Sequence, residues 1–344
     1  MKGFYSMGNQ GDAEGYSIAK DQHIRVCLKH DVESIRSNGL ETIELSPGLP
    51  DFRVSDIDTT TRFLGKKLSV PLLISPITGG GILSERINRN LAKAAERLHI
   101  AMAVGSQRPM LEKRAPKGSY LVRKWAPTIP LLANLGLVHV RRGKEYLLEA
   151  IESIQADGII LYVNPLHEIL QQEGEDDFRG LLGLLDGMLK DFPYPVFMKE
   201  VGFGLPDSLL KWIASRPVAG VDAAGMGGTN WARIEGLLQA KDYGPYEELG
   251  RGTKDVLISA ARLLRPHHCL IASGGIRTGI HMAKAFALGA DMAAMALPLL
   301  RWANVSVDRI IEEVEGLRKE LSVAMWFCGS KTIEDLKDHH KQIR

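Results

Sequence analysis

The chain has 344 residues, 45% of them apolar, so it can bury a large core in one or two domains. Its 43 Lys and Arg residues nearly balance its 41 Asp and Glu residues, and the net charge of +2 gives no reason to expect nucleic acid or an anionic membrane as a partner. The cysteines, Cys27, Cys269 and Cys328, are too few and too far apart for a disulfide framework or a zinc site, which indicates a reducing cytosol.

The N-terminal stretch "MKGFYSMGNQGDAEGYSIAK" is polar and rich in glycine. It lacks the apolar core of a signal peptide, and no apolar run in the chain approaches the ~20 residues that span a bilayer. We therefore expect a cytoplasmic protein with a loosely ordered start.

Short apolar runs bounded by Gly, Pro or Asn alternate with helical patterns along the rest of the chain. Each run is nearly apolar throughout, which is typical of parallel strands covered on both faces. The runs begin at Val70, Ile100, Pro130, Gly158, Pro195, Gly220, His268 and Asp291.

The segments between these runs carry the spacing of amphipathic helices. After the first run, Ser84 is placed to cap a helix, and after the fifth, Pro206 suits a first helical position. The apolar stripes are Ile87, Leu91, Ala94, Ala95 and Leu98; Phe178, Leu181, Leu182, Leu185 and Leu189; and Ile310, Val314, Leu317 and Leu321.

A strand followed by a helix, about eight times over roughly 250 residues, predicts an α/β fold of the (β/α)8 or TIM-barrel type. The barrel would take residues 66–344, and residues 1–65 would form an N-terminal extension on or over its mouth. The alternative, a doubly wound open sheet, requires a glycine fingerprint after an early strand. "GFGLPD" and "GMGGTN" both lack the third glycine of that fingerprint.

The active site of such a barrel lies at the C-terminal ends of its strands, and those ends are polar and glycine-rich here. They carry Thr78-Gly79-Gly80, Gly105–Arg108, Asn134, Asn164 with His167 and Glu168, Lys199, Gly225–Trp231 and Ser273–Arg277. A glycine pair or an asparagine at a strand end is often only a turn. Lys199 is more informative, because an ammonium inside an apolar strand requires an anion. Glu200 follows it directly and points to the opposite face, so we expect a different anion.

The last two strand ends indicate a phosphate site. "SGGIRTG" offers close backbone N–H groups, the charge of Arg277 and a following helix N-terminus, and "MALPLL" offers more backbone. This pattern predicts a phosphate-anchored cofactor across the barrel mouth. Flavin mononucleotide (FMN) fits, with Lys199 beside the N1 and O2 atoms of its ring.

Taken together, these motifs resemble the FMN-dependent (type 2) isopentenyl diphosphate isomerase family. The resemblance runs from about Ile18 to Leu300. It is carried by "KDQHI", "FLGKKLSVPLLISPITGG", "AMAVGSQR", "ANLG", "NPLHE", "EGEDDFRG", "KEVGFG", "GGTNWARIE" and "ASGGIRTG". The resemblance implies a TIM barrel that interconverts isopentenyl and dimethylallyl diphosphate by flavin-assisted proton transfer. It also implies Mg2+ on the diphosphate, NADPH or another reductant to keep the flavin reduced, and a homotetramer or homo-octamer.

The resemblance also assigns roles to residues. Glu168 would bind the metal, and His167, Asn164 and Lys199 would be catalytic. The substrate would contact Lys20, His23, Ser106, Gln107, Arg108 and Trp231. FMN would contact Ile77, Thr78, Gly79, Ser106, Asn134, Lys199, Thr229, Gly274, Gly275, Arg277, Ala296 and Leu297, whereas Ala224 stands where the family usually has a serine.

The substrate side departs further from the family. An arginine is replaced by Ala19, histidines by Ser46 and Tyr162, a serine by Pro206, and the proton-transfer glutamine by His167. Losing the arginine removes a charge-assisted phosphate bond, for which Arg251 could compensate from another loop. A histidine at 167 can do acid–base work that an amide cannot.

These departures leave two functions open. One is the isomerase with an altered pocket, and the other is a diverged flavoenzyme with a different prenyl or unphosphorylated substrate and net redox chemistry. Other flavin barrels fit less well. A 2-hydroxy-acid oxidase requires a His-Gly-Gly-Arg type of base site, and a purine-nucleotide dehydrogenase requires a loop cysteine after strand six; the sequence has neither. A non-catalytic flavin-binding sensor would bind FMN and turn over none of the candidate substrates.

Overall fold

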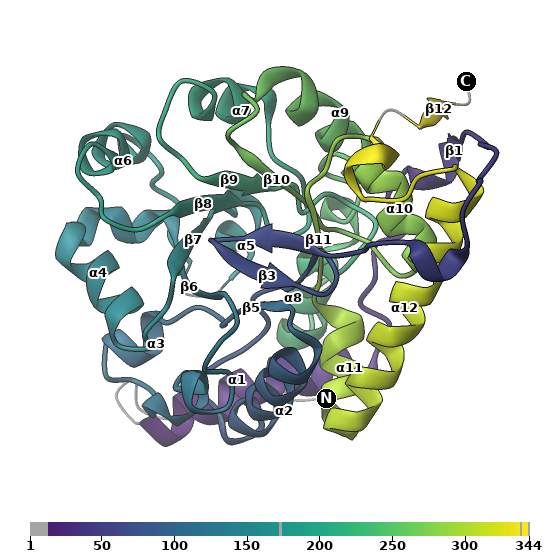
Figure 1. Ribbon diagram of the computed structural model, residues 1–344. Coiled ribbons are helices and arrows are strands. Elements are labelled where there is room, and N and C mark those ends of the chain that lie inside the picture. Colours follow the sequence, from purple (N-terminus) through teal and green to yellow (C-terminus); the bar gives the residue numbers. More distant parts are fainter. Residues whose placement is uncertain (1–12, 172–173, 338, 343–344) are drawn as a thin grey trace.

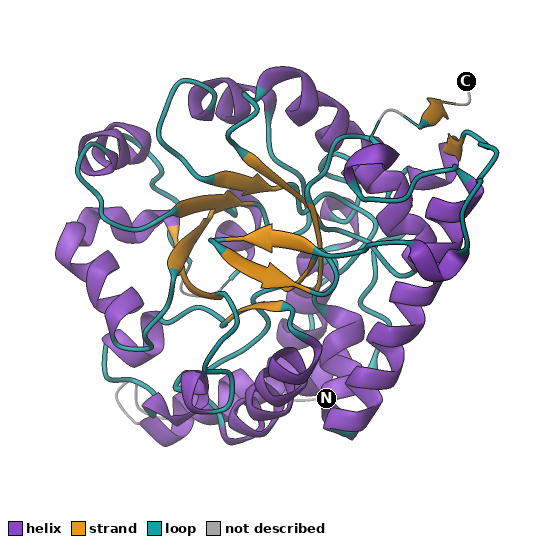
Figure 2. Cartoon of the chain, in the orientation of Figure 1, coloured by secondary structure: helices purple, strands orange, loops and turns teal. Residues whose placement is uncertain are grey.

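The computed structural model describes residues 13–171, 174–337 and 339–342, without side chains for 13–20 and 341–342. Within these residues, eight strands form a closed barrel in the order β10-β11-β4-β5-β6-β7-β8-β9, and every neighbouring pair is parallel (Figures 1 and 2). The strands are β4 Leu72–Ile74, β5 Ala101–Ala103, β6 Leu131–Gly136, β7 Gly158–Tyr162, β8 Val196–Lys199, β9 Gly220–Asp222, β10 Cys269–Ala272 and β11 Met292–Met295. Each lies in one of the predicted apolar runs, so the predicted TIM barrel is confirmed.

Helices surround the barrel, as Figure 2 shows in purple. They are α1 Ala13–Lys29, α2 Ile82–Leu98, α3 Arg108–Leu111, α4 Lys144–Glu152, α5 Pro165–Leu170, α6 Leu181–Leu189, α7 Asp207–Ile213, α8 Trp231–Gln239, α9 Thr253–Leu263, α10 Gly279–Ala287, α11 Leu297–Val305 and α12 Val307–Phe327. The predicted stripe of α2 is fully packed, since Ile87, Leu91, Ala94 and Ala95 are at most 1% exposed. None of the described helices combines the length and apolarity needed to cross a membrane.

Two predicted helix starts were wrong by one or a few residues. Helix α2 begins at Ile82 with Gly81 as its cap, and Ser84 lies inside the first turn, where its hydroxyl pairs with Thr78 Oγ1 at 2.8 Å. Pro206 is the capping residue of α7 rather than its first helical residue. Both errors arise because a serine or proline near a helix start fits several adjacent positions.

Side chains fill the barrel interior, and a hairpin closes its N-terminal end. The antiparallel strands β2 Thr61–Phe63 and β3 Lys66–Leu68 lie across the barrel opening in Figure 1. Phe63 and Leu68 pack there with inward residues of the barrel, and the Phe63 ring lies 5.4 Å from that of Phe197. Burying an aromatic side chain of this kind contributes about 1.5–3 kcal/mol. Among the described residues, the hairpin therefore covers the N-terminal end of the barrel, and the cavity lies at the opposite end.

Residues before the barrel also pack on its other end and side. Helix α1 packs against α2 and α8, and strand β1 Ile43–Leu45 pairs with β12 His340–Gln342 near the C-terminus. His23, Ile24 and Cys27 of α1 line the cavity at the C-terminal end of the barrel. The division of the chain at residue 65 stays a prediction.

Candidate functional site

A cavity occupies the C-terminal end of the barrel, and strand periodicity explains its lining. The buried layer beneath it includes Leu73, Ala103, Leu132, Ile160, Phe197, Ile271 and Ala294. Side chains alternate along a strand, so residues two positions further on point to the same inner face. Those residues are Ser75, Gly105, Asn134, Tyr162, Lys199, Ser273 and Ala296, and all of them line the cavity.

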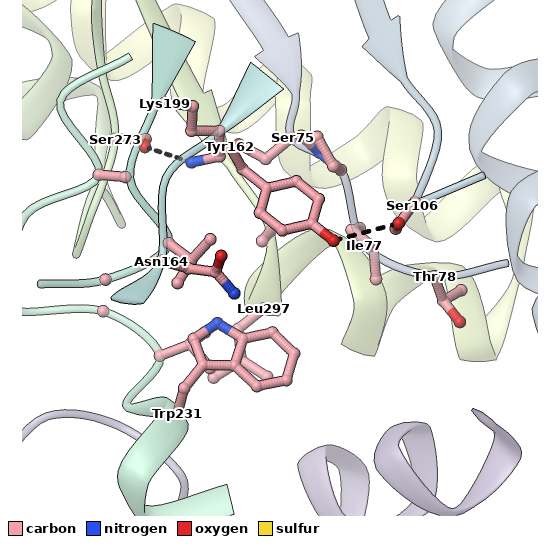
Figure 3. Close-up of a pocket in the computed structure, with 18 of the residues that line it drawn as sticks. Ser75, Ile77, Thr78, Ser106, Tyr162, Asn164, Lys199, Trp231, Ser273 and Leu297 are labelled. Carbon is pink, nitrogen blue, oxygen red and sulfur yellow. Dashed lines mark hydrogen bonds between the residues drawn. The ribbon is translucent and has the colours of Figure 1, made fainter. Parts of the chain in front are cut away.

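The structure brings nearly all of the predicted site residues to this one cavity, and Figure 3 labels several of them. Their roles stay predictions, and their convergence agrees with the predicted site at the C-terminal ends of the strands. The residues are His23, Ile77, Thr78, Gly79, Ser106, Arg108, Asn134, Asn164, His167, Glu168, Lys199, Thr229, Trp231, Gly274, Gly275, Arg277, Ala296 and Leu297.

Lys20 and Gln107 are the exceptions. Lys20 and the neighbouring Ala19 belong to α1, and their side chains lie outside the described residues. Gln107 is fully buried and does not line the cavity: its Nε2 donates to the Ala150 carbonyl, and its Oε1 accepts from the Asn134 N–H at 3.0 Å. This side chain supports the wall of the barrel, and in this position it does not reach a substrate.

Lys199 has the anionic partner that its buried position requires. Its Nζ lies 3.0 Å from Oδ2 of Asp222, the residue opposite it on the neighbouring strand β9. The ammonium also lies 3.4 Å from Ser273 Oγ (Figure 3). That hydroxyl donates to the other Asp222 oxygen. Asp222 is fully buried, so the three side chains form a closed polar group at the floor of the cavity.

Glu200 has a structural role, on the opposite face of the same strand. Its Oε2 accepts the backbone N–H groups of Val201, Gly202, Phe203 and Gly204. Burial raises the pKa of this carboxyl to about 7, although these four donors favour the charged form. The prediction that Lys199 pairs with an anion other than Glu200 is confirmed, but the partner in the structure is the Asp222 carboxylate, whereas the sequence suggested a bound cofactor. That a flavin also lies beside Lys199 stays a prediction.

One polar atom in the cavity wall has no partner. The side-chain oxygen of Asn134 is buried and accepts no hydrogen bond from the described residues. Buried polar atoms are nearly always paired, so this oxygen calls for an N–H donor on a bound molecule. A flavin ring offers one such donor, which makes the site chemically suited to FMN.

The other end of the cavity is made of glycine-rich backbone. Gly274 and Gly275 have φ angles of +97° and +79°, in the region that favours glycine. Arg277 follows, and Thr278 caps α10 by accepting the His281 N–H at 3.0 Å. Backbone N–H groups, a cation and a helix N-terminus are together the usual surroundings of a phosphate.

His167 lies in a cluster of polar and aromatic groups. Its Nε2 is 3.1 Å from Glu235 Oε1, and its ring centroid is 4.3 Å from that of Trp231. His23 Nε2 lies 3.5 Å from the same Glu235 oxygen. Burial of Glu235 opposes its ionisation, but the hydrogen bonds from His167 and His23 hold its pKa below the usual range. The buried Glu235 carboxylate thus lies against two histidines of the cavity.

Glu168 is held on the same side. Its Oε1 accepts from Asn164 Nδ2 at 3.0 Å, and its Oε2 accepts from the Glu175 N–H at 3.0 Å. A carboxylate has about four acceptor positions, so two remain for a metal or its waters. The described residues contain no group of three or more acidic, histidine or cysteine side chains that could hold a metal ion by itself.

The departures from the family divide between the cavity and its surroundings. Tyr162 lines the cavity, and its hydroxyl donates to Ser106 Oγ at 3.2 Å (Figure 3). Ser46 and Pro206 do not line it. The expected compensation by Arg251 was wrong, because its guanidinium is held by Asp207 at 2.6 Å, Leu205 O and Ser259 Oγ.

Sequence reasoning missed Asp222 and Glu235. Both are buried acids, at 0% and 4% exposed, which is a rare placement unless a cation pairs with them. The aspartate inside the apolar run "GVDAAG" was the available signal for Asp222. Glu235 lies one helical turn after Trp231, on the same face of α8, and that spacing was its signal.

Comparison with known proteins places this cavity in context. The family model described as FMN-dependent dehydrogenase matches residues 35–163 and 248–342. The isopentenyl-diphosphate delta-isomerase of Paracoccus zeaxanthinifaciens is 42% identical over 348 residues, covering 97% of this chain and 99% of that protein. The enzyme of the same name from Thermococcus kodakarensis is 37% identical, covering 96% of this chain and 92% of that protein.

Solved structures share the fold at lower identity. A mutant flavocytochrome b2 with pyruvate bound has a TM-score of 0.70 at 16% identity, covering 97% of this chain and 87% of that one. A mutant of (S)-mandelate dehydrogenase has a TM-score of 0.67 at 17% identity, covering 97% of this chain and 100% of that one. At such identities the likeness concerns the barrel and carries no statement about substrate.

Proposed function

The chain belongs to the FMN-dependent (type 2) isopentenyl diphosphate isomerase family, and from this premise we propose that it interconverts isopentenyl and dimethylallyl diphosphate. The observation that carries the proposal is the convergence of the predicted flavin-side and substrate-side residues on one cavity. The reaction moves a double bond by adding a proton at one carbon and removing one from another, with no net redox change. The site therefore has to bind a cofactor, an anion and an apolar chain, and to move protons.

The flavin end of the cavity is supplied by Asn134, Lys199 and the glycine loop at 274–275. FMN, kept reduced by NADPH or another donor, would supply an electron-rich ring for the reaction. The Asn134 oxygen, which has no partner among the described residues, would hold the ring through a hydrogen bond. The Lys199 ammonium, itself balanced by Asp222 at 3.0 Å, provides a fixed positive charge that favours an electron-rich neighbour.

The proton-transfer end is supplied by His167 and its partners. Nε2 of His167 lies 3.1 Å from Glu235 Oε1, and its Nδ1 lies 3.3 Å from Asn164 Nδ2 and 3.1 Å from Gln171 Nε2. The Glu235 carboxylate and the Trp231 ring, whose centroid is 4.3 Å from that of the imidazole, fix the position of the His167 side chain. His167 is therefore the group that we propose moves the proton, which the reaction requires.

The diphosphate end is supplied by Lys20, His23, Arg108 and Glu168. The cationic side chains would bind phosphate oxygens. Glu168 would help to hold Mg2+, which proteins commonly bind through one or two carboxylates together with substrate phosphates and water. NADPH as the reductant, a homotetramer or homo-octamer and a cytoplasmic location are proposals that the family suggests.

The alternative is a diverged flavoenzyme with a different prenyl or unphosphorylated substrate. The observation that favours it is that Tyr162 and His167, both in the cavity, replace residues of the family's substrate side. The retained His23, Arg108 and Glu168 favour the isomerase, because an unphosphorylated substrate would not require them.

The test is an anaerobic assay of the purified protein with reduced FMN, Mg2+ and isopentenyl diphosphate. Dimethylallyl diphosphate should form, and its formation should stop when the flavin is oxidised or Mg2+ is chelated. A flavin-loaded protein that forms no product would refute the isomerase activity. Consumption of NADPH in proportion to another substrate would establish the alternative.

A further inference from the structure

A segment before the barrel, Val32–Asn38, contacts two glycine-rich loops at the phosphate end of the cavity. The first loop is 225–230, and the second is 273–277. The backbone of the segment pairs with the first loop: Ser34 N–H donates to Gly228 O at 2.7 Å, and Val32 O accepts from Asn230 N–H at 2.8 Å. On the second loop, Asn38 Nδ2 donates to Gly275 O at 2.7 Å. The segment therefore fixes the two loops against each other.

Glu33 lies within this segment and places its carboxylate on Arg277. Oε2 of Glu33 is 2.8 Å from Nη2 of Arg277 and 3.3 Å from its Nε, and Oε1 is 3.3 Å from Nη1 of Arg301. The backbone of Glu33 is itself bridged to Thr229. Glu33 does not line the cavity, whereas Arg277 does. The carboxylate thus binds the Nε and Nη2 edge of the guanidinium and does not itself line the cavity.

We propose that Glu33 is a positioning residue for the cofactor phosphate, which it serves by holding Arg277 in the orientation that binds it; this rests on FMN being the cofactor, as proposed above. Arg277 has five N–H donors in a planar fork. Glu33 accepts from two of them, and the Ile276 carbonyl accepts from a third, on Nη1, at 2.9 Å. The other two remain for a phosphate oxygen. In this arrangement Arg277 has already lost the rotamer freedom that phosphate binding would otherwise have to remove.

Glu33 could also weaken phosphate binding by competing for Arg277. This effect is weaker than the gain from orienting the guanidinium. The Glu33 side chain is 33% exposed, so water and salt screen its repulsion of a phosphate bound beyond the guanidinium. Arg301 lies on its other oxygen and offsets part of the same charge. The orientation of Arg277, by contrast, depends on its hydrogen bonds to Glu33, and water cannot hold the guanidinium in the same position.

The experiment titrates flavin-free protein with FMN and, separately, with riboflavin, and follows the quenching of flavin fluorescence. Glu33→Ala should weaken FMN binding about tenfold, the effect of losing one charge-assisted contact, and leave riboflavin binding unchanged. Glu33→Gln keeps an acceptor for Arg277 and should lose less. Asp186→Ala is the matched control, since it removes a carboxylate that also pairs with an arginine, Arg216, and that does not line the cavity.

Each other outcome overturns the inference. Unchanged or tighter FMN binding by Glu33→Ala would show that the carboxylate does not position Arg277, or that it competes with phosphate. Equal losses for FMN and riboflavin would show a general disturbance of the loops. A wild-type protein that binds no FMN would refute the proposed cofactor and this inference with it, whereas tight wild-type binding with an unaffected variant refutes only the role of Glu33.

Discussion

Neutralising Asp222 should destabilise the protein far more than neutralising Asp222 and Lys199 together. Their charged atoms are 3.0 Å apart, with exposures of 0% and 8%. At an effective dielectric constant of about 20, a pair at this distance attracts by about 5 kcal/mol, which the loss of hydration of both ions largely offsets. Asp222→Asn keeps the shape of the side chain but leaves a buried ammonium without its counter-ion, at a cost of about 3–5 kcal/mol.

The assay is urea unfolding of four flavin-free proteins: the wild type, Asp222→Asn, Lys199→Met and the double variant. Each single substitution strands one buried charge, whereas the double variant contains neither charge. The double variant should therefore be more stable than the sum of the single losses predicts, with a coupling energy of about 3 kcal/mol. Losses that simply add would refute the claim that the two charges stabilise each other.

Three further predictions concern single positions around the site. The pKa of Glu200 is raised to about 7, so the wild type should lose stability as pH rises from 4.5 to 7. Glu200→Gln does not titrate and should therefore gain stability relative to the wild type over that interval, by about 3 kcal/mol at most. Unfolding measured at several pH values tests this. Gly275→Ala should abolish FMN retention, since its φ of +79° disfavours a side chain and a methyl group would meet Gly227 O; flavin content after gel filtration reports it. Glu235→Gln should lower kcat about 10–100-fold with FMN content unchanged, and a fully active variant would remove Glu235 from the proton-transfer group.

Much of the fold and the cavity could be predicted, because both follow from local rules. The eight apolar runs marked the barrel strands, and the polar residues at their ends had to meet because parallel strands finish at one end of a barrel. That Lys199 needs an anion other than Glu200 was also predictable, but the sequence pointed to a cofactor and not to a protein carboxylate. Asp222 became its partner only through the pairing of β8 with β9.

The rest depended on side-chain directions and long-range contacts. Gln107 lies between Ser106 and Arg108, both of which line the cavity, but its side chain turns into the barrel wall. Arg251 was expected to serve a phosphate and instead pairs with Asp207, 44 residues away in the chain. Glu33 reaches Arg277 across 244 positions. No local pattern specifies such contacts, because they are set by how distant loops pack.

The most direct test of the account follows isopentenyl diphosphate in heavy water by NMR, anaerobically, with reduced FMN and Mg2+. Wild-type protein should form dimethylallyl diphosphate and incorporate deuterium, His167→Ala should do neither while retaining FMN, and His167→Gln, which restores the family's residue, should recover part of the rate. Wild-type protein that holds FMN but exchanges no deuterium, or a His167→Ala variant that exchanges it at the wild-type rate, would contradict the proposed proton transfer at His167.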